Sequence, residues 1–299
     1  MWPVRDPRRS TLAPLLVSVL LAGSLAACSA GSSSSGSGGL RVVAAAYPFA
    51  EAARWVGGDR VAVEDLTPPG TEPHDLEVTS EQVDALLDAD LAIVAGGAFQ
   101  PALEDAADRR DGSTLVVLDA PGITGTDPHV WLDPVAMASV VRVTRDALLA
   151  VDGADAPSIR AGARAALARL AGLDREYRTG LARCDRRVLV TAHDAFGRLG
   201  ARYDLRVESI AGISPEQEPD PRRIARLARL VRDEGITTVF TEELVSPQVA
   251  RVLARDAGVR TEVLSPIESL TPAQRRAGED YRSLMRRNLD RIRTALGCG

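Results

Sequence analysis

The chain contains only three histidines, and each lies in a short segment that contains proline or an acidic residue. The segments read TEPHDLE around His74, DPHVWLDP around His129 and TAHDAFG around His193. Neutral imidazole is a common metal ligand, and a group of three histidines suits zinc best among the divalent ions. The pattern therefore predicts one divalent metal ion held by His74, His129 and His193.

Carboxylates stand close to every histidine and are candidate acceptors for the second ring N–H. Such an acceptor fixes the tautomer, so that the other nitrogen points its lone pair at the metal. For a single histidine, an ordinary polar loop residue is an equally good interpretation. The three together, in similar surroundings, favour a metal site. The neighbouring carboxylates are Asp75, Glu77, Asp127, Asp133 and Asp194.

Strand-like and helix-like segments alternate along the chain after residue 40. Short apolar runs bounded by turns are typical of parallel strands buried on both faces. We therefore predict an α/β fold of two lobes, each a mainly parallel four-stranded sheet flanked by helices. The predicted strands are residues 41–46, 61–66, 91–94, 115–118, 188–191, 205–210, 237–240 and 261–264, and the predicted helices include 48–56, 80–89, 194–202, 221–234, 247–257 and 274–296.

One long helix is predicted between the lobes, because residues 157–183 keep apolar side chains at helical spacing and contain no strand pattern. At 1.5 Å per residue this segment would span roughly 40 Å. Its three glycines oppose a helix by about 1 kcal/mol each, so packing must hold it. The predicted boundaries are 41–152 for the first lobe, 153–184 for the linking helix and 185–299 for the second lobe.

Each histidine is predicted to follow a strand. His74 comes after the second strand, His129 after the fourth, and His193 after the first strand of the second lobe. Ligands of open parallel sheets gather outside the carboxyl ends of the strands. Two such edges facing each other would place the metal ion between the lobes.

The N-terminal residues 1–27 have the features of a secretory signal peptide. Three arginines precede a short apolar stretch, which is too brief to span a membrane as a helix. Residues 25–28 read LAAC and resemble a bacterial lipobox, which implies that Cys28 is lipidated; the alternative is an ordinary cleavage site with an incidental cysteine. The Gly/Ser-rich composition of residues 28–40 predicts a flexible tether. We expect a protein anchored by lipid to the outer face of the bacterial cell membrane.

Two cysteines remain once Cys28 is assigned to lipid. In an exported protein, Cys184 and Cys298 are a candidate disulfide pair, with two free thiols as the alternative. The formal net charge of −5 argues against nucleic acid as a partner. The sequence also lacks the HExxH, GxSxG, P-loop and dinucleotide-binding motifs.

Several of these segments resemble the signatures of the zinc/manganese solute-binding proteins of ATP-binding-cassette importers, most closely the zinc-uptake type. The resemblance covers essentially the whole chain after the tether. It implies two α/β lobes joined by one long helix and a metal ion bound at their interface by His74, His129 and His193. It also implies a monomer that delivers its ion to a membrane permease and catalyses nothing. The matching segments are EPHD at 72–75, PHVWLDP at 128–134, HDAFG at 193–197, IAGISPE at 210–216 and EP at 218–219.

The chain departs from that family at the expected fourth ligand. The family carries an aspartate in a Leu-Asp-Pro string after the last strand, whereas residues 264–268 here read LSPIE. Serine is a poor metal ligand. The fourth position therefore falls to water, to the hydroxyl of Ser265, or to a carboxylate such as Glu268 or Glu242.

The choice of metal follows from the ligand types. Three imidazoles favour Zn²⁺, whereas Mn²⁺ prefers more oxygen ligands. Many zinc-specific relatives carry a His-rich loop between the first two ligand motifs, but no histidine lies between His74 and His129. We predict zinc, with a manganese-selective protein of the same family as the alternative. A zinc-dependent hydrolase with water at the open position, and a surface adhesin with incidental metal, are the rival functions.

Overall fold

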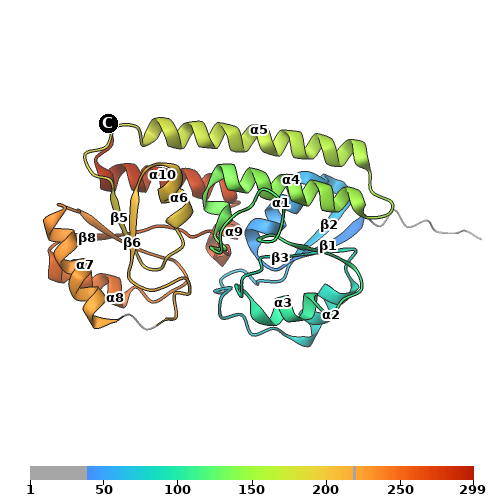
Figure 1. Ribbon diagram of the computed structural model, residues 1–299, viewed down its shortest axis with the longest axis horizontal. Coiled ribbons are helices and arrows are strands. Elements are labelled where there is room, and N and C mark those ends of the chain that lie inside the picture. Colours follow the sequence, from blue (N-terminus) through green and yellow to red (C-terminus); the bar gives the residue numbers. More distant parts are fainter. Residues whose placement is uncertain (1–38, 218–219) are drawn as a thin grey trace, which may run out of the picture. The chain divides into compact units, whose positions relative to one another are not determined.

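Parallel strands form two separate four-stranded sheets in the computed structural model, which describes residues 39–217 and 220–299 (Figure 1). The first sheet has the order β2-β1-β3-β4 and the second has the order β6-β5-β7-β8. Every pairing between the strands of these two sheets is parallel. The strands are β1 (Leu40–Ala44), β2 (Val61–Asp65), β3 (Leu91–Val94), β4 (Ser113–Val116), β5 (Val188–Thr191), β6 (Arg206–Ser209), β7 (Thr238–Thr241) and β8 (Arg260–Val263).

Helices cover both faces of each sheet, which explains why the central strands β3, β5 and β7 are buried along their whole length. In the first lobe, α1 (Tyr47–Gly57) and α4 (Pro134–Ala150) share one apolar core, and α2 (Ser80–Asp88) and α3 (Pro101–Ala107) share another. In the second lobe, α7 (Pro221–Asp233) and α8 (Gln248–Ala257) pack on one face. The other face carries α6 (Gly197–Arg202) and α10 (Tyr281–Leu296). The predicted fold class is confirmed.

A single helix, α5 (Ala156–Gly180), connects the two lobes. It begins after Asp155, whose carboxylate accepts the backbone N–H of Ser158 and so caps the helix. In Figure 1 it runs beside α4 and α10. Gly162 is required by this packing, because a Cβ there would lie 2.4 Å from the carbonyl oxygen of Val56 in α1. Close contact along α5 offsets the unfavourable helix propensity of this glycine.

The C-terminal helix differs from its prediction. In place of one helix over 274–296, the structure has α9 (Pro272–Arg276), a break, and then α10. Gly278 in the break has a positive φ of 70°. Asp280 and Ser283 then form a capping box that starts α10. The break turns the start of α10 toward the first lobe, where the Tyr281 hydroxyl donates to the carbonyl oxygen of Trp131.

Some predictions concern residues outside the described part of the chain. These are the signal peptide 1–27, the lipidated Cys28 and all but the last two residues of the tether. Among the described residues, no helix combines the length and the hydropathy needed to cross a membrane.

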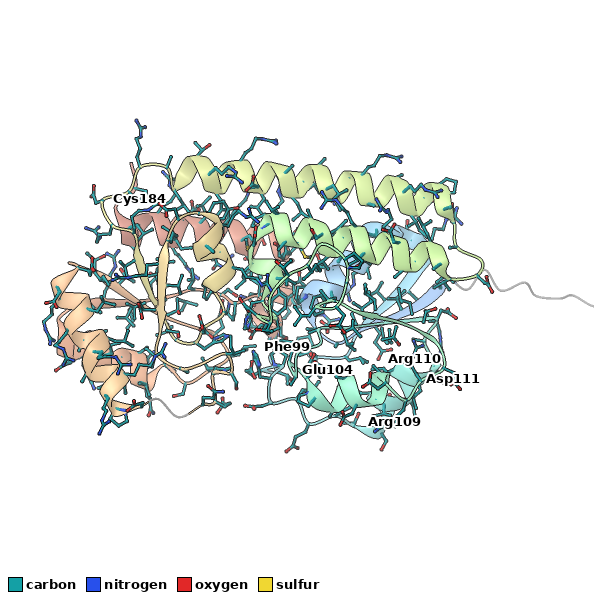
Figure 2. All side chains as sticks on the ribbon, viewed as in Figure 1. Phe99, Glu104, Arg109, Arg110, Asp111 and Cys184 are labelled. Carbon is teal, nitrogen blue, oxygen red and sulfur yellow. A yellow bond between two sulfur atoms is a disulfide. The ribbon has the colours of Figure 1, made fainter. Side chains whose placement is uncertain are left out.

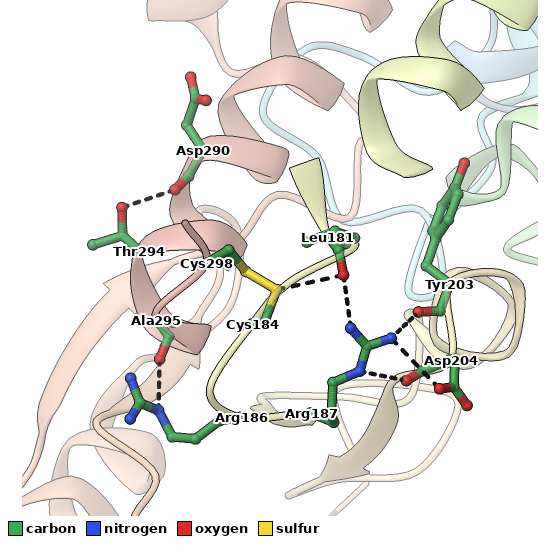
Figure 3. The surroundings of a disulfide bond; sticks show 10 residues. All are labelled: Leu181, Cys184, Arg186, Arg187, Tyr203, Asp204, Asp290, Thr294, Ala295 and Cys298. Atoms are coloured by element: carbon green, nitrogen blue, oxygen red, sulfur yellow. Dashed lines mark hydrogen bonds and ion pairs between the residues drawn. A yellow bond between two sulfur atoms is a disulfide. The ribbon is translucent and has the colours of Figure 1, made fainter. Parts of the chain in front are cut away.

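A disulfide joins Cys184 to Cys298, at the end of the chain (Figure 3). The two cysteines are 114 residues apart in sequence, so the bond ties the segment after α5 to the segment after α10. Beside it, the carbonyl oxygen of Leu181 accepts a hydrogen bond from the Arg187 guanidinium. The cross-link therefore encloses the whole second lobe in one covalent loop.

We expect replacement of both Cys184 and Cys298 by serine to lower the free energy of unfolding by about 2–4 kcal/mol, because the cross-link restricts the unfolded chain. Urea unfolding followed by circular dichroism would measure this loss. Figure 2 shows Cys184 far from Phe99, which packs against His74, so metal affinity should stay unchanged and serves as the control. An unfolding midpoint that does not move would contradict the prediction.

Candidate metal centre

Three histidines and one glutamate that are distant in sequence meet between the two lobes. Nε2 of His129 and Nε2 of His193 lie 3.4 Å apart. Glu268 Oε1 lies 3.0 Å from His129 Nε2, 3.3 Å from His193 Nε2 and 3.6 Å from His74 Nε2. All four donor atoms lie within 4.8 Å of one another. The structure thus brings the three sequence-predicted histidines together and adds Glu268 to them.

Each of the four side chains lies in a segment that follows the carboxyl end of a strand. His74 follows β2 and His129 follows β4, so the first lobe supplies two donors. His193 follows β5 and Glu268 follows β8, so the second lobe supplies the other two. The carboxyl ends of both sheets therefore face the same point, as expected for ligand sites of parallel α/β folds.

The donor spacing fits a single ion. Zinc bonds of about 2.0–2.1 Å in a tetrahedron give ligand-to-ligand distances of roughly 3.3–3.4 Å. Among the described residues, the buried atoms His74 Nε2 and Glu268 Oε1 have no hydrogen-bond partner. A buried polar atom without a partner costs free energy, and a shared cation would remove that cost for both.

The second ring nitrogens of two histidines are held by carboxylates. His129 Nδ1 lies 2.8 Å from Asp127 Oδ1, which also accepts the His129 backbone N–H. His193 Nδ1 lies 2.7 Å from Glu242 Oε2. Because a carboxylate accepts a proton at Nδ1, the Nε2 lone pairs of both rings are free to face the centre.

We expect Glu242→Gln to weaken metal binding by about 10–100-fold, the usual effect of removing a partner that orients a ligand. Metal titration of the two proteins would measure the change. Glu243→Gln is a matched control, because Glu243 is the next residue in the chain and accepts from Gln274 instead of a histidine. Equal losses in both variants would contradict an orienting role for Glu242.

Charge interactions set the protonation of the centre before any metal arrives. Burial favours neutral imidazoles, but Asp127 and Glu268 outweigh it and raise the pKa of His129. Burial likewise opposes the charged form of His193, yet Glu242 and Glu268 raise its pKa well above the usual value. Burial also opposes ionisation of Glu268, but the histidines hold its pKa well below its usual range. The metal-free centre therefore attracts protons to the imidazoles while Glu268 stays ionised.

A further carboxyl group, Glu72, lies in the loop that carries His74. Burial and the charge of Glu268 raise the pKa of Glu72 to about 9. One oxygen of Glu72 accepts the backbone N–H of Asp75 at 3.2 Å. Glu72 is therefore protonated at neutral pH, and Glu268 carries the charge of this carboxyl pair.

Aromatic rings form an apolar wall beside the histidines. Phe99 packs edge-on against His74 with 4.5 Å between ring centroids, and Figure 2 shows it in the loop before α3, near the meeting point of the lobes. Trp131 contacts His129 at 5.3 Å and Phe99 at 5.7 Å. Both aromatic side chains are buried, so the wall fixes the rings and keeps water from that side of the centre.

The loop that presents Glu268 has a strained backbone. Ile267 has a φ of 57°, a left-handed conformation that is unfavourable for a β-branched residue. The preceding carbonyl, of Pro266, accepts a hydrogen bond of 2.7 Å from the Trp131 indole. This bond crosses from the first lobe to the second, so Trp131 both packs against His129 and anchors the Glu268 loop.

The other two candidates for the fourth position lie elsewhere. Glu242 contacts His193 on the ring nitrogen that faces away from the centre. The backbone of Ser265 forms a reciprocal pair with the side-chain amide of Asn288, at 3.0 and 2.7 Å, and its hydroxyl accepts the N–H of Ile267. The hydrogen bonds of Ser265 therefore hold the loop in place. Glu268, three residues later, is the loop residue that reaches the centre.

The remaining carboxylates from the sequence have different surroundings. Asp75 and Glu77 are exposed, and Asp133 caps α4 through the N–H of Val135. Asp127 accepts the ring N–H of His129. Sequence reasoning missed the anchor between Trp131 and Pro266, although a tryptophan inside a ligand motif could have signalled it.

Comparisons with known proteins identify the family of this chain. Residues 42–295 match the family described as zinc-uptake complex component A, periplasmic, or ZnuA. The chain is 34% identical over 301 residues to the zinc-binding lipoprotein AdcA of Streptococcus pneumoniae; the match covers 93% of this chain but only 60% of that protein's length. It is 29% identical to the high-affinity zinc uptake system protein ZnuA of Bacillus subtilis, with coverage of 89% and 90%.

A solved structure shares the fold over its whole length. The zinc-bound ZnuA-like domain of pneumococcal AdcA matches with a TM-score of 0.74 and 35% identity, over 87% of this chain and 99% of that domain. Since the family match spans nearly all of the described residues, the chain belongs to the ZnuA family of zinc-uptake components.

Proposed function

We propose that this protein captures a Zn²⁺ ion outside the cytoplasm and delivers it to the permease of an ATP-binding-cassette importer. The ligands are His74, His129, His193 and Glu268. The observation that carries the proposal is the convergence of their four side-chain donor atoms within 4.8 Å of one another. The names of the relatives, a zinc-binding lipoprotein and a zinc uptake protein, support the same metal and process.

Zinc is preferred over manganese because of the donor set. Three imidazole nitrogens and one carboxylate oxygen match a four-coordinate zinc site, whereas Mn²⁺ favours sites richer in oxygen. The carboxylates of Glu242 and Asp127 are engaged with ring nitrogens, and Glu72 is protonated, which supports a low oxygen count. A manganese-selective protein is the alternative, and competitive titration with zinc and manganese distinguishes the two.

The same donor set argues for binding without catalysis. A catalytic zinc site keeps one position open for water, usually with three protein ligands. A fourth ligand from Glu268 fills that position in a tetrahedral site. The protein is thus proposed to be a carrier, and the zinc-dependent hydrolase is disfavoured.

The proposal includes the organisation of the chain. Residues 1–27 serve as the signal peptide, Cys28 carries the lipid, and residues 28–40 tether a monomer to the outer face of the cell membrane. Residues 41–152 and 185–299 form the metal-binding lobes, and 153–184 link them. Because each lobe supplies two ligands, docking on the permease would release zinc by moving the lobes apart.

Competitive titration of metal-stripped protein with zinc and manganese tests the metal assignment. We expect one tight zinc site per chain and much weaker manganese binding. Manganese binding as tight as zinc would select the alternative, and absence of tight binding for either ion would refute the proposal. For delivery, zinc dissociation should accelerate when the permease complex is added in membranes; equal rates with and without it would contradict release by docking.

A further inference from the structure

Two arginines of α6 in the second lobe reach the His129 loop of the first lobe. Arg198 donates to the carbonyl oxygen of Asp127 through Nη2 at 2.7 Å and Nε at 2.9 Å. Arg202, one helical turn later, contacts both carboxylate oxygens of Asp133, with Nη2 2.8 Å from Oδ2 and Nε 3.0 Å from Oδ1. The two contacts bracket His129, one before it and one after it.

The first contact acts on the residue that orients a ligand. Asp127 accepts the His129 ring N–H through Oδ1 while its backbone carbonyl is held by Arg198. The carboxylate of Asp127 also lies 3.6 Å from Arg198 Nε. Movement of α6 away from the first lobe would therefore displace Asp127 or break its hydrogen bonds to Arg198. Asp127 is the residue that sets the orientation of the His129 ring.

The second contact is a charge-assisted pair at the start of α4. The Asp133 side chain is only 6% exposed and also caps α4, so its position is fixed. Paired arginine–carboxylate hydrogen bonds are among the strong ones and depend on geometry as well as charge. Arg202 therefore ties the second lobe to a rigid point of the first.

The position of α6 in the chain links these contacts to the other lobe's ligand. The helix begins at Gly197, four residues after His193. One short segment of the second lobe thus carries the proposed zinc ligand His193 together with Arg198 and Arg202. These two arginines hydrogen-bond to the first-lobe loop that carries His129.

We infer that Arg198 and Arg202 are positioning residues that latch the lobes together at the metal centre and slow the release of zinc. The inference rests on the proposed function. Neither arginine belongs to the four donors, so both act through the His129 loop. The lobes cannot separate at the centre without breaking these hydrogen bonds, so the latch contributes to the barrier for zinc dissociation.

The test measures zinc dissociation by stopped flow, with a fluorescent chelator in excess, for Arg198→Gln and Arg202→Gln. Loss of hydrogen bonds to a charged group should raise the dissociation rate about tenfold in each variant. Arg206→Gln is the matched control: Arg206 pairs with Glu234 at 2.9 Å, within the second lobe, and its loss should leave the rate unchanged. Equal acceleration in all three variants would overturn the inference.

A double-mutant cycle separates the latch from general loss of stability. Asp133→Asn removes the carboxylate charge but keeps an oxygen that can cap α4. If the Arg202–Asp133 pair carries the effect, combining Arg202→Gln with Asp133→Asn should accelerate release little more than either change alone. Fully additive effects would count against the pair. Thermal unfolding of the metal-free variants, compared with Arg206→Gln, shows whether they fold normally.

The dissociation experiment distinguishes failure of the proposed function from failure of the latch. If the unaltered protein binds no zinc, the proposed function fails. If it binds zinc tightly and the folded Arg198→Gln and Arg202→Gln variants release it at the original rate, the latch alone is refuted.

Discussion

The substitution His193→Ala is expected to weaken zinc binding strongly. His193 Nε2 lies 3.4 Å from His129 Nε2 and 3.3 Å from Glu268 Oε1, so the ring takes one corner of the proposed site. Structural zinc sites contribute about 10–16 kcal/mol in total, which is roughly 3 kcal/mol for each of four ligands. Loss of one ligand should therefore weaken affinity by about a hundredfold or more.

Competitive titration with a chelator of known affinity would measure the loss. Because His193→Ala also leaves the buried Glu242 without its partner, His74→Ala is a useful second variant: His74 is the least buried of the three histidines. Asp75→Ala is the control, since Asp75 is the exposed neighbour of His74. Unchanged zinc affinity in both folded histidine variants would mean that the metal binds elsewhere.

Much of the fold could be predicted because strands that are buried on both faces appear in the sequence as continuous apolar runs. The runs at 91–94 and 188–191 are continuously apolar or nearly so, and both are strands buried along their length. Periodicity alone does not predict the break between α9 and α10, because apolar residues continue at helical spacing across it. The positive φ of Gly278 and the Asp280 capping box override that periodicity.

The candidate site was predictable to the extent that it depends on strand ends. His74, His129 and His193 each follow a strand, and topology alone brings such positions to one edge of a sheet. The sequence leaves the fourth position open among water, Ser265, Glu268 and Glu242, since no periodicity predicts the left-handed backbone of Ile267 in the loop that carries Glu268. The contacts of Arg198 and Arg202 depend on how the two lobes pack, and local sequence does not encode that.

Zinc affinity is also expected to fall steeply with decreasing pH, starting above the usual range for histidine. Burial disfavours charged imidazoles, but Glu242, Asp127 and Glu268 together raise the pKa values of His129 and His193 in the metal-free protein. Zinc binds only the neutral rings, so protons compete with the metal and binding releases them. For the two histidines with raised pKa values, proton release alone should change the logarithm of the dissociation constant by up to about two for each pH unit.

The pH dependence of stability has opposite signs in the zinc-free and the zinc-bound protein. Without zinc, a raised histidine pKa stabilises the fold below the unfolded value of about 6.5, and this contribution is lost as pH rises through the folded pKa. With zinc, stability instead grows as pH rises, because deprotonated rings bind the ion. The increase in melting temperature caused by zinc should therefore become larger between pH 5 and pH 8.

Calorimetric titrations in buffers of different ionisation enthalpy would count the protons released on binding, and melting curves would test the stability trend. Glu242→Gln sharpens the test, because it removes the charge that raises the pKa of His193. That variant should bind zinc more weakly at high pH yet lose affinity at a lower pH than the original protein. Affinity that is independent of pH between 5 and 8 would show that these imidazoles do not exchange protons for metal.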